Sequence, residues 1–222
     1  MTTTATSGEV DEGAALLGAS VYERLRSQVL DGELAPGQAL SVPRLAAQLD
    51  VSRSPVREAV QQLIHDGLAV HVPFAGATVT TIDAEGLRAL FRVREVLDGL
   101  AAHEAAGLVS LDELDTMQEV LDRQRHSLTL PADEARDSGL DLQFHRLVRA
   151  AARNAPLTQA LERLEAIGHL HGSSMWQLDL NRRVAVAEHA AILAAVEAGD
   201  AKRARECAEA HVAGLLVRMT RS

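Results

Sequence analysis

Four residues in the second half of the chain carry metal-binding side chains, and their spacing allows them to meet. Asp141 and His145 are four positions apart in a segment with a helical pattern, so both side chains leave the same helix face. His189 lies ten residues before Gly199, and His211 lies twelve residues after it. If two antiparallel helices turn at Gly199, both imidazoles lie about 15–18 Å from the turn, at a rise of about 1.5 Å per residue. The two histidines would then be neighbours.

Three imidazoles and one carboxylate suit a divalent transition metal such as zinc, nickel or manganese, with positions left for water or an anion. Histidines in helices are also commonly packed in a core or exposed to solvent. The spacing alone therefore leaves a metal site and four unrelated side chains as open interpretations. The other histidines lack such pairing and are interpreted as structural or surface residues, with His169 and His171 as candidates for the lining of a cavity.

A second group of polar residues recurs every fourth position in the first third of the chain. Arg53, Arg57 and Gln61 share one face of a predicted helix. An exposed arginine can offer its fork of donors to guanine O6 and N7, or pair with a phosphate. A different face carries an apolar stripe that is expected to be buried, formed by Val56, Val60, Leu63 and Ile64. This pattern indicates a helix that reads DNA.

The beginning of this helix is marked by residues that favour helix starts. Ser52 and Ser54 can each cap it, and Pro55 is tolerated in a first turn because its missing amide hydrogen would have no partner there. Arg53 and Ser54 are therefore expected at the amino-terminal tip, the part of a recognition helix that points into the major groove.

The surrounding segments complete a winged helix-turn-helix. A preceding short helix has a small apolar face at Leu45, Ala46 and Leu49. Two β-prone runs follow, 69–72 and 77–81, separated by a turn that contains Pro73, Phe74 and Gly76. A further helix is expected from about Ser20 to Leu30, with Val21, Leu25 and Val29 on one side.

With these motifs the chain resembles a known family. The segment VSRSPVREAVQQLIHDGLAVHVPFAGATV, residues 51–79, is similar to the amino-terminal domain of GntR-type bacterial transcription regulators. Residues 83–222 look like the all-helical (FCD-type) ligand-binding domain of the FadR-like branch of that family. The resemblance covers nearly everything after the first eighteen residues. It implies a mainly α fold, with a winged helix-turn-helix followed by an all-helical bundle.

The resemblance also implies roles for individual residues. It places Asp141, His145, His189 and His211 at the metal-ligand positions of metal-binding members. Arg94 aligns with an arginine that faces the same cavity and can clamp a carboxylate, while an ion pair with Asp98 is an equally weighted alternative. Asn154, in the break before Pro156, is interpreted as a helix cap, with an effector contact as the alternative. The residues expected to contact DNA are Arg53, Ser54, Arg57, Gln61, Arg44, Ser52 and the wing glycine Gly76.

The sequence departs from the family pattern at two places. Members often carry glycine at the turn between the two helices, where this chain has Asp50. They often carry a polar Asn-Arg pair before the wing glycine, where this chain has Phe74 and Ala75. Contacts from the wing to the minor groove are therefore left open.

Composition and charge limit the possible partners. The 222 residues are 47% hydrophobic, which is enough for a small and a larger domain, and charges interrupt every apolar run. The polar start lacks the features of a signal peptide, so we expect a cytoplasmic protein that does not enter the membrane. Cys207 is the only cysteine, which excludes an intrachain disulfide and cysteine-based zinc clusters.

The net charge of −9 argues against general attraction to nucleic acid. Residues 19–81 hold five basic and six acidic side chains, so even the predicted reading domain is not basic. Affinity for DNA must come from a few placed arginines, a helix amino terminus and two copies of the domain.

The chain is expected to fall into three parts. Residues 1–18 are predicted to be a disordered tail, 19–81 the DNA-binding domain and 82–222 a metal- and effector-binding domain. Six helices are predicted in the last part, at roughly 83–107, 111–128, 133–152, 157–174, 179–198 and 200–220.

The leading hypothesis is a homodimeric transcription regulator, expected to be a repressor, which binds a pseudo-palindromic double-stranded operator. A small organic acid bound at the metal site would control it. One alternative is a regulator that responds to the metal itself. A less favoured one is a metal-dependent hydrolase or lyase, for which the sequence shows no additional general base beside the ligands. We therefore predict that the protein is not an enzyme.

Overall fold

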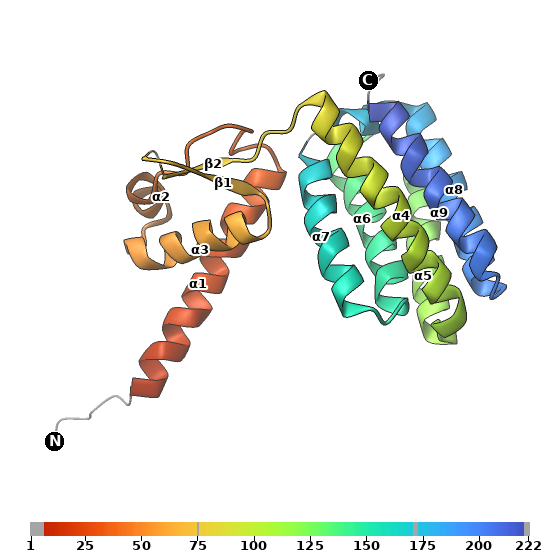
Figure 1. Ribbon diagram of the computed structural model, residues 1–222, viewed down its shortest axis with the longest axis horizontal. Coiled ribbons are helices and arrows are strands. Elements are labelled where there is room, and N and C mark those ends of the chain that lie inside the picture. The colour runs from red at the N-terminus through yellow and green to blue at the C-terminus, as the bar shows by residue number, and fades with distance from the viewer. Residues whose placement is uncertain (1–6, 75, 171–172, 220–222) are drawn as a thin grey trace. The chain divides into compact units, whose positions relative to one another are not determined.

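The computed structural model describes the backbone of residues 7–74, 76–170 and 173–219. Contacts divide the chain into two compact units, Met1–Thr81 and Ile82–Ser222. The first unit contains α1 (Ser7–Leu30), α2 (Val42–Leu49), α3 (Arg53–His65), β1 (Ala69–Val72) and β2 (Gly76–Val79). The second contains α4 (Ala84–Leu108), α5 (Leu111–Ser127), α6 (Glu134–Ala151), α7 (Ala155–His169), the short 3₁₀ helix η1 (Ser173–Gln177), α8 (Asp179–Glu197) and α9 (Ala201–Met219). The predicted mainly α fold is confirmed (Figure 1).

The first unit is a winged helix-turn-helix in which α1 packs against α3. Val21, Leu25 and Val29 form the buried face of α1, as their spacing predicts. The turn after α2 passes through Asp50, whose φ of 55° lies in the left-handed region that glycine usually occupies. The amides of Asp50 and Val51 both bond the carbonyl of Ala46, and these bonds stabilise the turn without a glycine.

The wing is a two-stranded antiparallel sheet. β1 pairs with β2 in a register that joins Ala69 to Val79 and Val72 to Gly76. Gly76 has a φ of 88°, so the turn requires a backbone conformation that is strained for other residues. The hydroxyl of Thr80 donates to the carbonyl of Gly67 at 2.6 Å and fixes the end of the wing to the end of α3.

The disordered tail predicted for residues 1–18 is only partly in agreement with the structure. Residues 1–6 lie outside the described residues, but α1 already begins at Ser7. Residues 14–17, Ala-Ala-Leu-Leu, are among the strongest helix formers, and their propensity favours a helical backbone over the expected irregular one.

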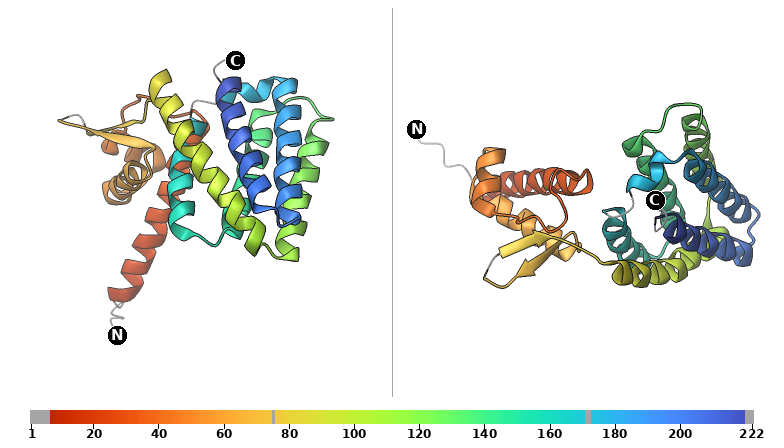
Figure 2. Two further views of the ribbon diagram at one scale, coloured as in Figure 1. Left: turned by 45° about the vertical axis from the view of Figure 1, so that its right-hand side comes forward. Right: turned by 90° about the horizontal axis from the view of Figure 1, so that it is seen from above.

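The second unit is a helical bundle. Helix α4 packs along α9 and also contacts α6, α7 and α8, while α8 and α9 form an antiparallel pair (Figures 1 and 2). Caps fix several helix starts: Ser110 and Glu113 form a reciprocal capping box at α5, and Asp133 accepts from the Arg136 amide at α6. The helix predicted over 157–174 is wrong at its end, because α7 stops at His169 and η1 follows.

Apolar side chains of α4, α5, α6, α8 and α9 form the main core, which contains Phe144, Met117 and Ile192. A second cluster joins α4 and α9 to Met175 and Trp176 of η1. Within the residues that the structure describes, none of the helices combines the length and the apolar character needed to cross a membrane.

Candidate metal centre and nucleic-acid interface

The face of α3 predicted to read DNA is exposed. Helix α3 begins at Arg53, and Arg53, Ser54, Arg57 and Gln61 are all accessible to solvent. In the described part of the chain, neither arginine forms an ion pair or a side-chain hydrogen bond, so both guanidinium groups are available to a ligand. The opposite face is buried through Pro55, Val56, Ala59, Val60 and Leu63, while Ile64 is only half-buried.

The predicted capping of α3 by a serine side chain is wrong. Ser52 occupies the cap position, but its hydroxyl makes no capping bond. Ser54 lies inside the helix and its hydroxyl instead donates to Glu58, four residues on, at 3.2 Å. The amides at this helix end therefore remain free to bind an anion.

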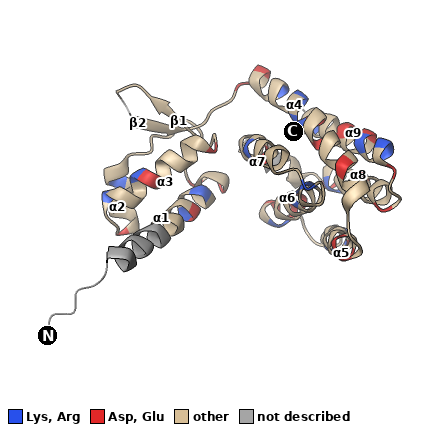
Figure 3. Cartoon of the chain, turned by 60° about the horizontal axis from the view of Figure 1, so that its bottom comes forward, with Lys and Arg blue, Asp and Glu red and all other residues tan. Residues whose placement is uncertain are grey.

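The other residues expected at DNA are also on the surface of this unit. Arg44 is exposed on α2, and basic residues appear on both α2 and α3 in Figure 3. Gly76 is exposed in the wing. Phe74, at the wing turn, is fully exposed and has a φ of 64°.

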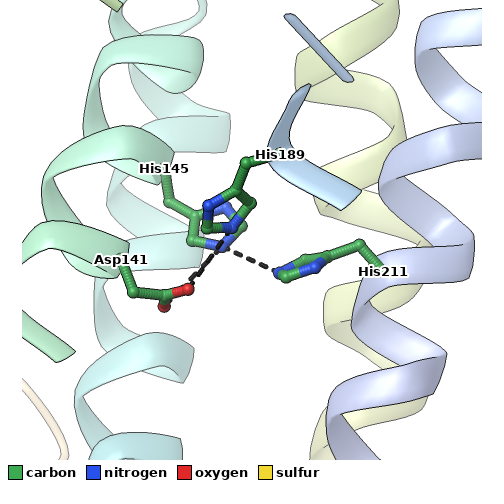
Figure 4. Close-up of side chains that lie close together, drawn as sticks. All are labelled: Asp141, His145, His189 and His211. Carbon is green, nitrogen blue, oxygen red and sulfur yellow. Dashed lines mark hydrogen bonds and ion pairs between the residues drawn. The ribbon is translucent and has the colours of Figure 1, made fainter. Parts of the chain in front are cut away.

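The four predicted metal-binding side chains meet inside the second unit (Figure 4). Asp141 and His145 come from α6, His189 from α8 and His211 from α9, and one ligand atom from each lies within 4.8 Å of the others. The antiparallel turn of α8 and α9 occurs at Gly199, with a φ of 68°, as the spacing predicts. All four residues are buried.

Two neighbouring side chains fix the orientation of the imidazoles. Gln124 of α5 donates its amide to the Leu140 carbonyl at 3.0 Å, so its oxygen, 2.9 Å from His189 Nδ1, must be the acceptor. Nδ1 of His189 therefore carries the proton, and its Nε2 presents a lone pair to the cluster.

The carboxylate of Glu188 does the same for His211. Its Oε2 lies 2.8 Å from His211 Nδ1, and Arg218 donates to both carboxylate oxygens at 3.0 and 2.7 Å. Because a carboxylate only accepts, the His211 proton is on Nδ1 and the Nε2 lone pair faces inward. Hydrogen bonds from His211 and Arg218 lower the pKa of Glu188 despite its burial, so this carboxylate stays charged.

The electrostatics of the cluster favour the protonation states that bind metals. Burial lowers the pKa of His145 well below its ordinary value and also lowers the pKa of His189. Burial alone would raise the pKa of Asp141, but the imidazoles of His145 and His189 outweigh it and the pKa lies below its usual range. Neutral imidazoles and an ionised carboxylate are the forms that coordinate metals.

The cluster has donor atoms that the protein itself does not satisfy. Asp141 Oδ1 and His189 Nε2 are 3.3 Å apart, yet both are buried without a hydrogen-bond partner. His145 Nε2 and His211 Nε2 lie 3.1 Å apart in a hydrogen bond, in which His145 is the donor because the His211 proton is on Nδ1, so a metal would take the place of that proton. Lone pairs that converge in a buried site repel one another unless a proton or a cation lies between them. The donor set therefore fits a divalent transition metal.

A small cavity of about 40 Å³ lies beside the cluster. Its polar lining comes from Asp141, Arg94, Glu165 and His169, and apolar walls come from Phe91, Leu142, Met175, Trp176, Leu215 and Met219. A water molecule needs roughly 10–15 Å³ measured in this way, so the cavity has room for a few waters or a small molecule. His171, the other histidine predicted near a cavity, lies outside the described residues.

Two buried ion pairs border this cavity. Arg94 Nε donates to Asp98 Oδ2 at 3.2 Å, so the intramolecular pair considered as an alternative is present, and the same Arg94 also lines the cavity. Arg149 Nη2 donates to both oxygens of Glu165, at 2.8 and 2.7 Å. Burial raises the pKa of Glu165, whereas Arg149 opposes that shift.

Asn154 is not part of the lining of this cavity, and it caps α7, the interpretation favoured from the sequence. Its side-chain oxygen accepts from the Leu157 amide at 3.1 Å and caps α7, while its amide donates to Glu104 at 3.0 Å. It lines a separate groove with His103 and Pro156. The cap explains the position, because Asn154 directly precedes the first residue of α7, Ala155, and the residue at this place is the one that satisfies free amides of the first turn.

Reasoning from the sequence did not identify Gln124, Glu188, Arg218, Arg149 or Glu165 as part of this site. For two of them, the spacing in the sequence could have indicated a place in the site. Arg149 follows His145 by four residues, so it continues the face formed by Asp141 and His145. Arg218 follows His211 by seven, which also places it on the ligand face of its helix.

Comparisons with known proteins support both units. Residues 17–79 match the model for bacterial regulatory proteins of the gntR family, and residues 89–214, more than half of the chain, match the FCD domain. The chain belongs to the GntR family. It is therefore a DNA-binding transcription regulator and not an enzyme, as predicted. FCD domains often bind metals.

Individual relatives align with this GntR-family regulator over most of its length. It is 34% identical to an uncharacterized HTH-type transcriptional regulator in an unstable DNA locus of Streptomyces ambofaciens, over 86% of this chain and 80% of that one. It is 28% identical to a probable D-xylose utilization operon transcriptional repressor of Paenarthrobacter nicotinovorans, over 90% and 87%. The solved structure of E. coli McbR/YncC has the same fold, with a TM-score of 0.80, 22% identity and coverage of 92% and 97%.

Proposed function

We propose that this regulator binds a divalent transition metal, zinc, nickel or manganese, through Asp141, His145, His189 and His211. The observation that carries the proposal is the convergence of buried lone pairs whose direction is set by Gln124 and Glu188. When bound, the metal supplies a positive centre that attracts an anion. The protein supplies the dry surroundings and the fixed ring orientations.

We propose in addition that a small carboxylic acid is the effector and that Arg94 is its contact in the protein. The cavity beside the cluster exposes Asp141 and Arg94 to the same space. A guanidinium group binds a carboxylate through two parallel hydrogen bonds, and Arg94 already holds the carboxylate of Asp98. An effector would compete with Asp98 for this side chain.

On the DNA side, Arg53, Ser54, Arg57 and Gln61 are proposed to contact base edges and phosphates. Arg44, Ser52 and Gly76 are proposed to contact the backbone of the duplex. The unit is not basic overall, so a homodimer that binds a pseudo-palindromic operator is proposed as the source of sufficient affinity. The apolar side chains Val93 and Val96 of α4 are 49% and 59% exposed, and a second copy of the chain is proposed to pack against them.

Repression is the proposed direction of control, because curated relatives of this chain are named as repressors. The acid can act only through its different affinity for the operator-binding and the released state of the dimer, a difference typically of about 1–3 kcal/mol.

The test uses the full chain and the DNA upstream of its own gene. Operator affinity is measured by fluorescence anisotropy with metal-loaded protein, across a panel of small acids. We expect one class of acid to weaken binding about 5- to 150-fold, the range of such coupling energies. Unchanged affinity across the panel would remove the acid from the proposal. If affinity follows free metal without any acid, the metal itself is the signal.

The proposed metal site is tested by a separate measurement. Cobalt added to the purified protein should give the absorption bands of a nitrogen-rich site, and His211→Ala should abolish them. His126→Ala changes an exposed histidine on α5 and serves as the matched control. Retention of the bands in the His211 variant would contradict the ligand set.

A further inference from the structure

The turn of the wing holds a side chain that the proposed function leaves unused. Phe74 lies between the end of β1 and the start of β2 and is fully exposed. A single exposed apolar side chain is common on a protein surface, so exposure alone carries no argument. The backbone of Phe74 is unusual as well, because its φ of 64° lies in the left-handed region. A bulky residue with this conformation is an outlier that needs a separate explanation.

The folded unit gains nothing from a phenylalanine at this position. The ring is not buried by other side chains, and glycine or asparagine would tolerate the positive φ with less strain. Both features cost free energy in the isolated protein. A partner that buries the ring of Phe74 would offset this cost, so the combination indicates a contact outside the chain.

The base of the wing is fixed, so its turn keeps a defined place relative to α3. Helix α3 packs against β1. The Thr80 hydroxyl donates to the Gly67 carbonyl at 2.6 Å, and the Leu40 amide donates to the Ala77 carbonyl at 2.8 Å. The wing and α3 therefore form one body, in which Phe74 accompanies the helix onto any duplex that the helix binds.

The length of the wing suits the groove next to the one that α3 would occupy. Four residues in each strand extend about 13 Å at roughly 3.3 Å per residue, and the turn and the phenyl ring add to this reach. The adjacent minor groove lies about half a helical turn, roughly 17 Å, from the centre of the major groove.

The charges of the wing indicate how it would contact DNA. Residues 69–79 contain no Lys, Arg, Asp or Glu, and His71 is the only ionisable side chain in this stretch. The wing therefore has no permanent cation to pair with a phosphate and no anion that the duplex would repel. Its turn carries Pro73 and Phe74, both exposed. Proline and phenylalanine are among the side chains that proteins insert between base steps from the minor groove.

We propose that Phe74 is an apolar wedge that enters the minor groove of the operator and partly unstacks one base step, so that the wing selects deformable DNA. The inference rests on the proposed function, since α3 must first hold the duplex. Pyrimidine–purine steps such as TA and CA unstack most easily, so one of them at the wing strengthens binding without a hydrogen bond to either base. Phe74 is thus a specificity-determining residue.

The test uses the full chain and a duplex from the DNA upstream of its own gene, with 2-aminopurine placed at one base step at a time across the footprint. The fluorescence of this base rises when it loses its stacking neighbours. We expect a rise at one step of each half-site with the native chain and none with Phe74→Asn. Energy transfer between dyes at the duplex ends should report a kink of about 20–90° that the variant lacks.

The affinities of two variants test the apolar character of the contact. Phe74→Asn should weaken operator binding by about 5- to 150-fold, the range for one contact between an aromatic ring and a base, and Phe74→Leu should weaken it less. The melting temperature of Phe74→Asn should not fall, because asparagine tolerates the positive φ. Leu111→Asn, at a leucine of α5 that is 79% exposed, is the matched control and should leave affinity and fluorescence unchanged.

A change in the DNA distinguishes a wedge from an ordinary contact. Replacement of the unstacked pyrimidine–purine step by AA should weaken binding of the native chain by about 5- to 150-fold and have little effect on Phe74→Asn. Equal loss in both proteins would show that the step is recognised by another part of the chain and would overturn the inference.

Tight binding of the native chain without a rise in fluorescence at any step would also overturn the inference and leave recognition by α3 intact. So would a change from dimer to monomer in sedimentation of Phe74→Asn, since the ring would then pack against a second copy. If the native chain binds the upstream DNA no more tightly than random duplex, the operator recognition of the proposed function fails together with the inference.

Discussion

Glu188 accepts a hydrogen bond from His211 at 2.8 Å and is itself held by both terminal nitrogens of Arg218. The carboxylate thereby connects the last turn of α9 to the candidate metal centre. It fixes the ring of His211 and increases the electron density on Nε2, because a negatively charged acceptor makes the imidazole a stronger ligand.

Replacement Glu188→Gln is expected to weaken metal binding by about 10- to 100-fold, the usual effect of losing such a partner. The amide retains an acceptor for His211 but loses the charge and one of the two bonds with Arg218. Competition with a chromophoric chelator measures the dissociation constant. Glu206→Gln, at an exposed glutamate of α9, should leave it unchanged, and equal weakening by both variants would show that Glu188 has no special role.

The stability of the metal-free protein should fall as pH decreases below about 6.5, the ordinary pKa of histidine. Burial lowers the pKa of His145 and His189 in the folded state, so the unfolded chain takes up protons first. The stabilisation is fully present above the unfolded pKa and is lost as pH falls towards the folded pKa values. Urea unfolding between pH 8 and 5 measures it.

The variant His189→Phe removes one of these groups and should make the pH dependence less steep. Phe144 stacks on His189 with ring centroids 4.3 Å apart, so an aromatic replacement keeps this contact. A pH dependence as steep as that of the native chain would contradict the assignment to the buried histidines.

Much of the site followed from local sequence rules. Asp141 and His145 share a helix face because they are four residues apart, and His189 meets His211 because Gly199 permits the tight turn between α8 and α9. Both rules depend on residues close in sequence or on one hairpin. The helical periodicity similarly predicted the buried stripe of α3.

The residues that orient the ligands could not be found in this way. Gln124 belongs to α5 and is 65 positions from His189, so its contact depends on how α5, α6 and α8 pack together. Periodicity shows that a face is buried but not which helix covers it. Arg94 is a similar case, since the sequence could not decide between Asp98 and the cavity, and the folded side chain contacts both.

The capping box of α5 gives a stability test outside the site. Glu113 bonds the Ser110 amide and the guanidinium of Arg153, and these partners lower its pKa to about 2. Its contribution should be present above pH 4.5, its ordinary pKa, and disappear as pH falls towards 2. Because the pair is partly exposed, Glu113→Gln is expected to cost only about 1 kcal/mol at pH 7.

Urea unfolding of both proteins at pH 7 and at pH 3 checks this prediction, and the difference between them should be smaller at pH 3. Glu119→Gln, at an exposed glutamate of the same helix, is the control and should have little effect. A constant difference at both pH values would show that the ionised carboxylate is not the stabilising group.

Recognition of the operator can be tested at the tip of α3. Arg53 is the first residue of the helix, is exposed and has no ion pair among the described residues, so the native fold does not depend on it. Arg53→Ala is therefore expected to weaken operator binding by about 10- to 100-fold, equivalent to roughly 1–3 kcal/mol for a bidentate base contact, without a change in melting temperature.

Arg146→Ala removes the same charge from an exposed position on α6 and should leave operator affinity nearly unchanged. Titration against the operator and against random duplex at two salt concentrations separates the two possible roles of Arg53. A base contact lowers affinity for the operator only, whereas a phosphate contact weakens both duplexes and reduces the salt dependence by about one unit of slope. An Arg53→Ala protein that binds both duplexes as the native chain does would remove Arg53 from the reading surface.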